Sequence, residues 1–390
     1  MGLTELWKLS RGQLEDKTVQ QIIAFAGSGV LTDAGPSCAE FREFLGHVPS
    51  TFLEKYADQC LSEAFSGSGF ALQDVINQIG RRLGFTVTDG RYRGTPAQVG
   101  YDGLWRFPDN HTVIVEVKTS DAYRVDLDRI AGYRKALTEK GEVQETASSI
   151  LLIVGRKDTG DLEAQIRGSR HAWDVRIISI DGLIRLMRLK ETMDDPKTIQ
   201  QISAILIPRE FTRLDSIIDL VFSTAEEVKQ ESLPSQEIED IQSEVDSAVE
   251  GPATLRAACM ARVEKHLGAT LIKRSASGYS SPDGQVAVVC SVSKQYIKPG
   301  FLRYWFAFHT HQSDFLSAAV SAYVAFGCGS EEQLLLIPFA DFKQWLDGLN
   351  ITERGGGVYW HVHVLRQSGT ILLDCKKGLA KVDLSKYVLS

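Results

Sequence analysis

The chain has 390 residues, more than a single hydrophobic core usually organises, so we expect two or three domains. No stretch approaches the roughly 20 apolar residues that cross a bilayer, and the N-terminal segment lacks the apolar run of a secretory signal, so neither a membrane protein nor a secreted one is expected. The net charge of −7 argues against a broadly basic surface, but residues 225–251, with nine acidic side chains and one lysine, contribute −8 of it. The remainder sums to +1, which is compatible with a local phosphate-binding face without predicting one.

The six cysteines are scattered along the chain, and no two have the close spacing of a zinc knuckle. Scattered cysteines in a long chain are typical of reduced, mostly buried thiols. We therefore expect a cytoplasmic protein.

Residues 1–60 are expected to form a helical region, because apolar residues recur at three-and-four spacing in residues 14–27 and 38–48. Residues 61–222 change to an α/β pattern. They begin with an amphipathic helix, continue with three strand-like segments and then alternate helices with apolar strands. This order predicts a central sheet flanked by helices.

Residues 223–252 are strongly acidic and poor in large apolar side chains, which predicts a solvated linker or an exposed helix. Residues 253–390 are expected to form a separate C-terminal α+β or α/β domain. Its first part loosely repeats the order of elements in residues 61–222, and Lys294 ends a strand-like run. However, Val292 rather than a carboxylate stands two residues before that lysine.

The main chemical signal lies in the stretch HTVIVEVKTS, which starts at His111. Side chains on a strand alternate between its two faces, so the valines at 113, 115 and 117 are predicted to share a buried face. Glu116 and Lys118 then point the other way, together at the end of the strand. Charged groups there are costly unless they are solvated, paired or bound to a metal.

A turn-rich link joins this strand to the preceding segment, YDGLWRF. If the turn centres near Asp109 and Asn110, Asp102 lies opposite residue 117. Cross-strand neighbours are about 5 Å apart and diagonal ones about 7 to 8 Å, so Asp102 is expected to share a corner with Glu116 and Lys118. A register shift of one residue would change the face.

Two carboxylates at this separation suit Mg²⁺, a hard cation that keeps several waters and accepts phosphate oxygens. Asp102 and Glu116 are therefore the predicted metal ligands, with Mn²⁺ as a substitute for Mg²⁺. Lys118 would orient the attacking water or stabilise the charge that develops on the phosphorane. The expected reaction is hydrolysis of a phosphodiester.

Asp102, thirteen intervening residues and then Glu116-Val117-Lys118 at the end of an apolar strand resemble the motif of the PD-(D/E)XK nuclease superfamily. The resemblance covers roughly residues 65–210 and includes the order of a helix, the Asp strand, the Glu-x-Lys strand, a helix, a strand and a helix. It implies a restriction-endonuclease-like fold, in which the matching Asp and Glu bind Mg²⁺ and the Lys assists catalysis. Tyr101 stands where the motif has Pro, a position that many members vary.

The resemblance also implies accessory residues. Members often add an acidic or Gln residue from the first helix, and Gln73 and Glu63 are the candidates here. The helix after the Lys strand often touches DNA or the active site, which makes Arg129 and Tyr133 candidates for nucleic-acid contacts.

Arg91 and Arg93 precede the Asp strand and are further candidates, because phosphate contacts dominate nucleic-acid affinity. Ordinary solvated side chains are the alternative for each of these arginines. The alternative for Glu116 and Lys118 is a solvated surface ion pair, which contributes about 0 to 1 kcal/mol.

Two groups of side chains in residues 253–390 have a functional interpretation that is less favoured than a structural one. The first is two His-x-His pairs, His309 with His311 and His361 with His363. No neighbouring Cys or carboxylate pattern supports a metal there. The second is a set of aromatic residues that could stack bases but are more often core: Trp305, Phe306, Phe308 and Trp360.

We therefore expect a cytoplasmic, Mg²⁺-dependent endodeoxyribonuclease of restriction or phage defence, with residues 253–390 as its recognition or sensor domain. The defence role is an analogy, since a fold does not set biology. Two alternatives stay open: a nuclease effector activated by a small molecule or protein through residues 253–390, and a non-catalytic DNA-binding protein that keeps the fold. RNA is an alternative substrate because it has the same phosphodiester, and double-strand cutting is compatible with a homodimer.

Overall fold

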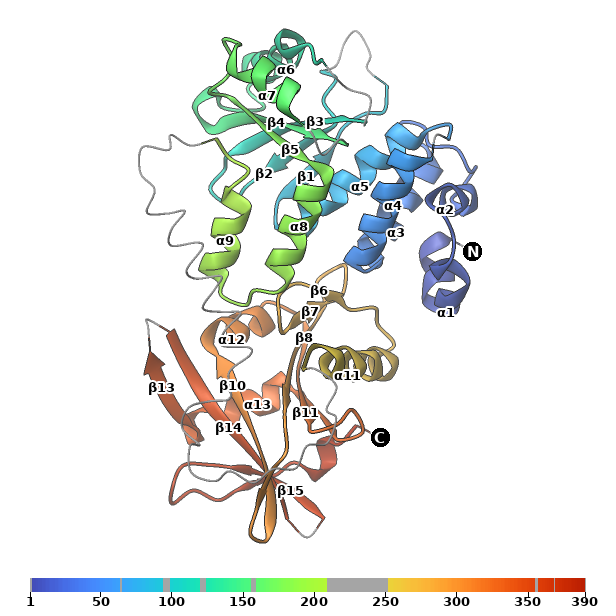
Figure 1. Ribbon diagram of the computed structural model, residues 1–390. Helices are drawn as coiled ribbons and strands as arrows, with labels where there is room; N and C mark the ends of the chain where they lie inside the picture. Colours follow the sequence, from blue (N-terminus) through green and yellow to red (C-terminus); the bar gives the residue numbers. More distant parts are fainter. Residues whose placement is uncertain are drawn as a thin grey trace. The chain divides into compact units, whose positions relative to one another are not determined.

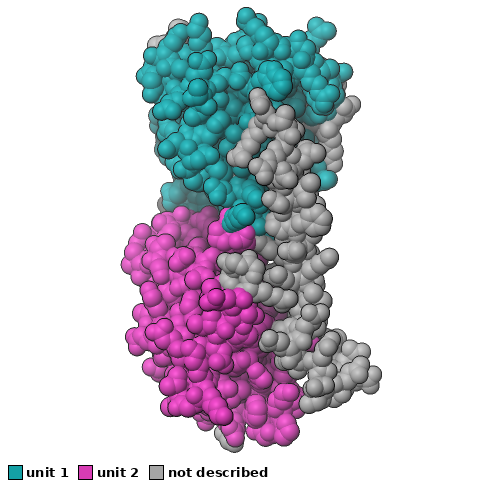
Figure 2. Space-filling view, turned by 90° about the vertical axis from the view of Figure 1, so that its left-hand side faces the viewer, with its two compact units in different colours: residues 1–193, 197–227 teal, residues 194–196, 228–390 magenta. Residues whose placement is uncertain are grey.

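The computed structural model describes residues 2–63, 65–93, 99–119, 124–155, 159–208, 252–354, 357–367 and 369–389. The chain divides into two compact units, one of residues 1–193 and 197–227 and the other of residues 194–196 and 228–390 (Figure 2). Both contain helices and sheets, which confirms the expected α/β class. The predicted acidic linker lies outside the described residues except for Pro252.

Four helices form the N-terminal region: α1 (Leu3–Glu15), α2 (Val19–Phe25), α3 (Pro36–His47) and α4 (Ser50–Ser62). The apolar spacing in residues 14–27 is divided between two helices, because α1 ends at Glu15 and α2 begins at Val19. Thr18 caps α2 by accepting the Gln21 N–H at 3.3 Å, while the Gln21 side chain accepts the Thr18 N–H at 3.0 Å. Apolar side chains of these helices join the core of the first unit, so residues 1–60 are not a separate unit.

The rest of the first unit is a five-stranded sheet with helices on both faces. In chain order its elements are α5 (Ser68–Leu83), β1 (Thr86–Asp89), β2 (Gly103–Arg106), β3 (Thr112–Lys118), α6 (Leu127–Glu139), β4 (Ser148–Val154), α7 (Gly160–Arg167), β5 (Val175–Ser179), α8 (Ile180–Glu191) and α9 (Pro196–Ala204). The strand order is β1-β2-β3-β4-β5. β1, β2 and β3 pair antiparallel, whereas β3, β4 and β5 pair parallel.

Helices α5 and α8 cover one face of this sheet, and α6 and α7 cover the other (Figure 1). Every residue of β4, which lies between β3 and β5, is buried, as its uninterrupted apolar run predicts for a parallel strand covered on both faces. The two cores leave the carboxyl end of β3 beside α5 and α6.

The second unit contains two sheets. Its elements are α11 (Pro252–Leu267), β6 (Ile272–Lys273), β7 (Gly278–Ser280), β8 (Val286–Ser293), β9 (Tyr296–Lys298), β10 (Phe301–His309), α12 (Thr310–Ser317), β11 (Ser321–Cys328), β12 (Leu334–Pro338), α13 (Phe339–Trp345), β13 (Asn350–Arg354), β14 (Gly357–Gln367), β15 (Thr370–Asp374) and β16 (Val382–Asp383). One sheet has the order β12-β11-β8-β7-β6, and the other has the order β16-β15-β14-β10-β9, with β13 also paired to β14.

A shared core lies between these two sheets, and α11 packs on the outer face of the β8 sheet. The loose repeat expected from the sequence is present in this sheet. A helix precedes three antiparallel strands, and a fourth strand runs parallel to the third, as in the first unit. The second unit differs because β9 and β10 precede α12, and because β12 runs antiparallel to β11.

Among the described residues, no helix combines the length and the apolar composition that spanning a bilayer requires. The six cysteines are all free thiols, and all but Cys375 are buried.

Candidate active site

Strand β3 ends with a carboxylate and an ammonium group on one face, as its alternation predicts. Val113 and Val115 belong to the core under α5, whereas Ile114 belongs to the core under α6. Glu116 continues the Ile114 face and is only 4% exposed. Lys118 Nζ lies 2.5 Å from Glu116 Oε1. The alternative of a solvated surface pair is therefore wrong for Glu116.

The hairpin between β2 and β3 gives Asp102 a register one residue away from the expected one. The Phe107 N–H bonds the His111 carbonyl at 2.8 Å, so the turn itself consists of residues 108–110. In this turn Asn110 adopts a φ of 66°, a left-handed conformation that Asn tolerates better than most residues. Gly103 consequently pairs with Val115. Asp102, one position further, lies opposite Glu116 rather than the residue after it. The expected pairing was wrong, and the observed one sets Asp102 on the Glu116 face.

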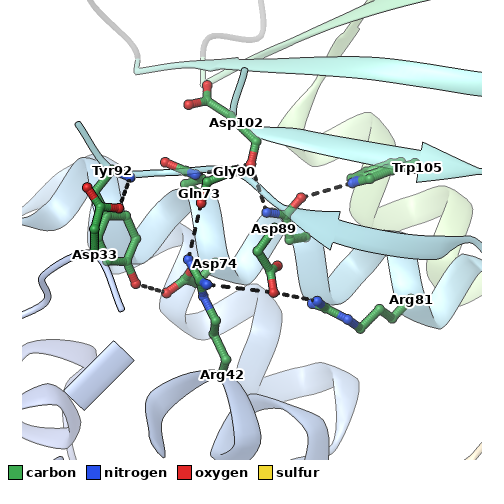
Figure 3. Close-up of polar contacts among 11 residues, drawn as sticks. Asp33, Arg42, Gln73, Asp74, Arg81, Asp89, Gly90, Tyr92, Asp102 and Trp105 are labelled. Carbon is green, nitrogen blue, oxygen red and sulfur yellow. Dashed lines mark hydrogen bonds and ion pairs between the residues drawn. The ribbon is translucent and has the colours of Figure 1, made fainter. Parts of the chain in front are cut away.

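Both the backbone and the side chain of Asp102 are held in place. Its carbonyl oxygen accepts Gln73 Nε2 at 3.0 Å, Asn77 Nδ2 at 2.9 Å and the Gly90 N–H at 3.0 Å (Figure 3). Its carboxylate Oδ2 accepts the Val117 N–H at 2.7 Å. These donors come from α5, from the residue after β1 and from β3, so three elements position this one residue.

Helix α5 approaches β2 closely because glycine stands at two contact points. A Cβ at Gly103 would lie 2.2 Å from Asn77 Oδ1, and one at Gly80 would lie 2.6 Å from Trp105 Cε2. The same Asn77 Oδ1 accepts Trp105 Nε1 at 2.9 Å. With side chains at either glycine, Asn77 would lose its reach to the Asp102 carbonyl.

The buried carboxylates at this corner would be stabilised by a bound cation. Burial and the neighbouring negative charge of Glu116 raise the pKa of Asp102 to about 7, against the opposing effects of the Val117 N–H and the Lys118 ammonium. Glu116 Oε1 is paired with Lys118 and lies 3.7 Å from Arg129 Nη2. Its other oxygen, Oε2, is buried and has no hydrogen-bond partner among the residues that the structure describes.

A buried acceptor without a partner costs free energy, and a bound cation would remove that cost. Asp102 and Glu116 supply two carboxylates, the number that Mg²⁺ commonly takes from protein while keeping waters and phosphate oxygens. The described residues contain no group of three or more His, Cys, Asp or Glu side chains that could hold a metal. The donor set therefore fits an open Mg²⁺ site and not a closed structural one.

Of the accessory candidates from the first helix, Gln73 lies at the corner. It is 4% exposed and bonds the Asp102 carbonyl, so its role there is to position the backbone. Glu63 is an exposed residue at the end of α4, where its N–H bonds the Gln59 carbonyl at 3.0 Å.

The candidates for nucleic-acid contacts lie in different surroundings. Arg129 is on α6, 56% exposed and close to Glu116. Tyr133 lies one turn further along α6, and its hydroxyl would be 3.4 Å from a Cβ at Gly100. Arg91 Nε lies 3.7 Å from Asp33 Oδ2, and the Arg93 N–H bonds the same oxygen at 3.3 Å. These last contacts stabilise the loop after β1.

A buried network beside Gln73 was not expected (Figure 3). Asp74 is 1% exposed and accepts Arg42 Nε of α3 at 2.8 Å and the Tyr92 hydroxyl. Burial raises the pKa of Asp74, and the Arg42 guanidinium opposes that rise. Arg42 also lies 3.8 Å from Asp89 Oδ2, which bonds Arg81 at 2.7 Å. The charges thus connect the N-terminal helices to the helix that holds Asp102.

The four aromatic residues that could have stacked bases, Trp305, Phe306, Phe308 and Trp360, lie in two different environments. Phe306 and Phe308 are 2% and 1% exposed and belong to the core between the sheets, with Trp360 packed against it. Trp305, on the same strand, points to the other face and is half-buried. The prediction that these residues belong to the core is confirmed for Phe306, Phe308 and Trp360 and is wrong for Trp305.

The comparisons with known proteins leave the chain unassigned. No model of a protein family matches the sequence, and a search of curated proteins finds no relative.

Proposed function

We propose that this chain is a metal-dependent endodeoxyribonuclease with a restriction-endonuclease-like catalytic unit. The observation that carries the proposal is the buried Oε2 of Glu116, which has no partner within the described part of the chain and lies beside Asp102 and Lys118. The order of elements supports it as well. α5, β2 with Asp102 at its start, β3, α6, β4 and α7 follow one another in the order that the resemblance implies, with β1 added after α5.

In the proposed reaction Asp102 and Glu116 would hold Mg²⁺, which would supply Lewis-acid chemistry to a phosphoryl oxygen and a bound water. Asp102 must lose its proton to act as a ligand, and its pKa of about 7 places that loss near neutral pH. Glu116 contributes the oxygen that lacks a protein partner. Gln73 and Asn77 keep the Asp102 backbone at fixed distance from β3.

Lys118 acts on the oxygen that develops negative charge. Its side chain is 25% exposed, so its ammonium group bonds Glu116 and still reaches solvent. An ammonium fixed next to the ligand set can orient a water or stabilise a phosphate oxygen. Arg129, 56% exposed on α6, adds positive charge for the nucleic-acid backbone.

The biological part of the proposal rests on the resemblance alone: restriction or phage defence in the cytoplasm, with DNA as the substrate. The test below also distinguishes two alternatives: RNA as the substrate, and a requirement for an activator that acts on residues 253–390.

The test is cleavage of supercoiled and linear DNA, plain, methylated and phage-derived, with Mg²⁺, Mn²⁺ or EDTA. Wild type is compared with Asp102→Asn, Glu116→Gln and Lys118→Met. Glu163→Gln is the matched control, because Glu163 is a half-exposed glutamate on α7 that pairs with Arg167. We expect metal-dependent cutting that the three site variants lose and the control keeps.

Cutting that survives Glu116→Gln and Asp102→Asn would place the chemistry elsewhere and overturn the proposal. A wild type that cuts RNA and no DNA would replace the substrate but keep the site. A wild type inert on every polymer, with and without cell extract as a source of activator, would reject the nuclease function.

A further inference from the structure

One face of the β10–β14 sheet in the second unit carries a continuous row of rings. Trp305 lies opposite His363, and His309 lies opposite Tyr359, across the two antiparallel strands. His361 stands between His363 and Tyr359 on β14. Residues directly opposite each other share a face, so these five side chains, called the ring row below, stand on one surface.

The rings of this row touch their neighbours. The Trp305 and His361 centroids are 6.0 Å apart, and those of Tyr359 and His361 are 5.0 Å apart. His309 and Tyr359 lie at 5.4 Å, and His361 and His363 are stacked at 6.1 Å with an interplanar angle of 22°. The row is therefore a single strip of aromatic surface.

This strip is partly exposed to solvent, whereas its back face is core. Tyr304, Phe306 and Phe308 alternate with the ring row along β10 and are at most 2% exposed. Every member of the ring row is half-buried instead. The solvated face of an antiparallel sheet usually carries polar side chains, and exposed aromatic surface usually marks a binding site.

The histidines of the row are held by protein partners, which argues for a role of their ring faces and not of their nitrogens. His361 Nδ1 accepts Trp305 Nε1 at 3.2 Å, and its Nε2 lies 2.7 Å from Thr352 Oγ1. His363 accepts Arg303 at 2.8 Å. Burial and the Arg303 charge lower the pKa of His363 to about 4, so this ring is neutral at pH 7.

Positive charge lies beside the row. Arg303 is on the same face of β10, and Tyr296 stands opposite it on β9. Lys298 is two residues further along β9 and shares that face. Asp374, opposite His363, lies 3.5 Å from Lys381 and is thereby balanced. Cations next to partly exposed rings match a polymer that alternates phosphates with flat bases.

We infer that the ring row binds single-stranded nucleic acid, with bases stacked on Trp305 and Tyr359 and phosphates bound by Arg303 and Lys298. Unpaired strands are the fitting form, since the faces of their bases are free to stack while those of a duplex are covered by neighbouring bases. This inference goes beyond the proposed nuclease function and does not depend on it, because no metal takes part.

The test measures fluorescence anisotropy of labelled twelve-nucleotide oligo(dT), oligo(U) and a DNA duplex with the full chain in EDTA, so that no metal-dependent cleavage occurs. Variants are Trp305→Ala, Tyr359→Ala and Arg303→Ala. Trp305→Phe is the conservative variant. Arg366→Ala is the matched control, because Arg366 pairs with Leu302 and so faces away from the ring row while its loss removes the same charge.

We expect single strands to bind, with affinity about tenfold weaker for each alanine variant at a ring position and close to wild type for Trp305→Phe and Arg366→Ala. Selective binding of oligo(dT) or of oligo(U) would identify DNA or RNA as the ligand. The inference is overturned if no single strand binds, or if binding survives in Trp305→Ala, Tyr359→Ala and Arg303→Ala alike. Thermal melting of each variant establishes that it is folded.

Failure of this test and failure of the nuclease proposal are distinguishable. A chain that cuts DNA, but whose ring-row variants bind single strands as wild type does, contradicts only the present inference. A chain that binds through the ring row, but has no metal-dependent activity, contradicts only the nuclease proposal.

Discussion

In the first unit, a helix, three antiparallel strands and a parallel fourth strand bring Asp102, Glu116 and Lys118 to one corner. In the second unit, α11, β6, β7, β8 and β11 follow the same succession, but residues 286–294 of the matching strand contain no carboxylate. Val292, two residues before Lys294, packs under α11. Ser291 and Ser293 occupy the face that corresponds to Glu116 in the first sheet.

This arrangement of strands therefore forms without the charged corner. In the second sheet the corresponding face packs between two sheets, and Ser293 Oγ accepts the Trp305 N–H at 3.1 Å. The corner of the first sheet is electrostatically costly, since it buries Glu116 Oε2 without a partner from any described residue. The charged corner is costly in the first sheet and absent from the second. Because the fold alone does not require this corner, its presence favours a function for the first sheet.

The largest expected effect separates the two sheets directly. Glu116→Gln removes the charge of one proposed ligand, so kcat/KM for DNA cleavage should fall by about 10³-fold or more. Ser291→Ala, at the corresponding face of the second sheet, should leave cleavage within about twofold of wild type. Steady-state cleavage assays with Mg²⁺ measure both. An equal loss in the two variants would mean that Glu116 acts only through stability.

The second prediction concerns how each sheet holds its first helix. α11 packs through apolar side chains, whereas the helices around α5 are joined by the buried pair of Arg42 and Asp74. Arg42→Met leaves Asp74 buried without its partner and should lower the free energy of unfolding by about 3 kcal/mol. Chemical denaturation measures this change.

The control for that prediction is Arg185→Met, because Arg185 is 75% exposed and pairs with Asp181 one turn away. Such surface pairs contribute less than about 0.5 kcal/mol. Adding Asp74→Asn to Arg42→Met should recover part of the lost stability, since no unpaired charge then stays buried. If the double variant is less stable than Arg42→Met, the ion-pair explanation fails.

The third prediction uses the pKa of Asp102, for which the second sheet has no counterpart. Binding of Mg²⁺ requires the ionised carboxylate, so affinity should rise about tenfold between pH 6 and pH 8 as the proton leaves. Titration calorimetry at the two pH values measures it. Asp102→Asn should bind weakly with little pH dependence, and an affinity of wild type that is constant over this range would contradict the assignment.

The same pKa affects stability with the opposite sign. The folded-state pKa of Asp102, about 7, lies above its ordinary value, so the proton is bound more tightly in the folded protein. The stability that this provides is present in acid and is lost as pH rises through 7. Thermal melting of metal-free protein should therefore show a lower Tm at pH 8 than at pH 5.5, and Mg²⁺ should restore it.

The smallest expected effect concerns Arg129, the exposed cation beside Glu116. If it contacts one phosphate, Arg129→Ala should reduce the slope of log affinity against log salt by about one. Lys343→Ala, on α13 of the second unit, should leave the slope unchanged. Both slopes are measured from the affinity for a DNA duplex in EDTA at salt concentrations between about 50 and 200 mM.

Local sequence patterns were sufficient to predict the elements in which hydrophobic residues recur regularly or form an unbroken run. The alternation in β3 and the apolar run of β4 are set by burial, and both were predicted. The pairing of Asp102 was not, because it depends on the left-handed φ of Asn110, which shortens the turn. One residue of register decided whether the two carboxylates share a face.

Contacts between distant residues were beyond such patterns. Arg42 and Asp74 are 32 residues apart, and Tyr92 joins them from a third segment. On α5 the polar residues Gln73, Asp74 and Asn77 are all buried, although the amphipathic pattern of the helix places them outside its apolar stripe. In β10 a signal was present, since the period of two alone separates Trp305 from its phenylalanine neighbours.

The close approach of α5 to β2 gives this corner a recognisable signature that does not involve charge. Asn77 can reach the Asp102 carbonyl only because the next residue is Gly103, and the two partners are 25 residues apart in sequence. A diverged chain with the same corner is expected to carry a helical Asn about that far ahead of an Asp-Gly pair, with a Gly on the following helical turn where Gly80 stands. Such a spacing of glycine and asparagine residues would identify distant relatives more selectively than the pattern formed by Asp102, Glu116 and Lys118.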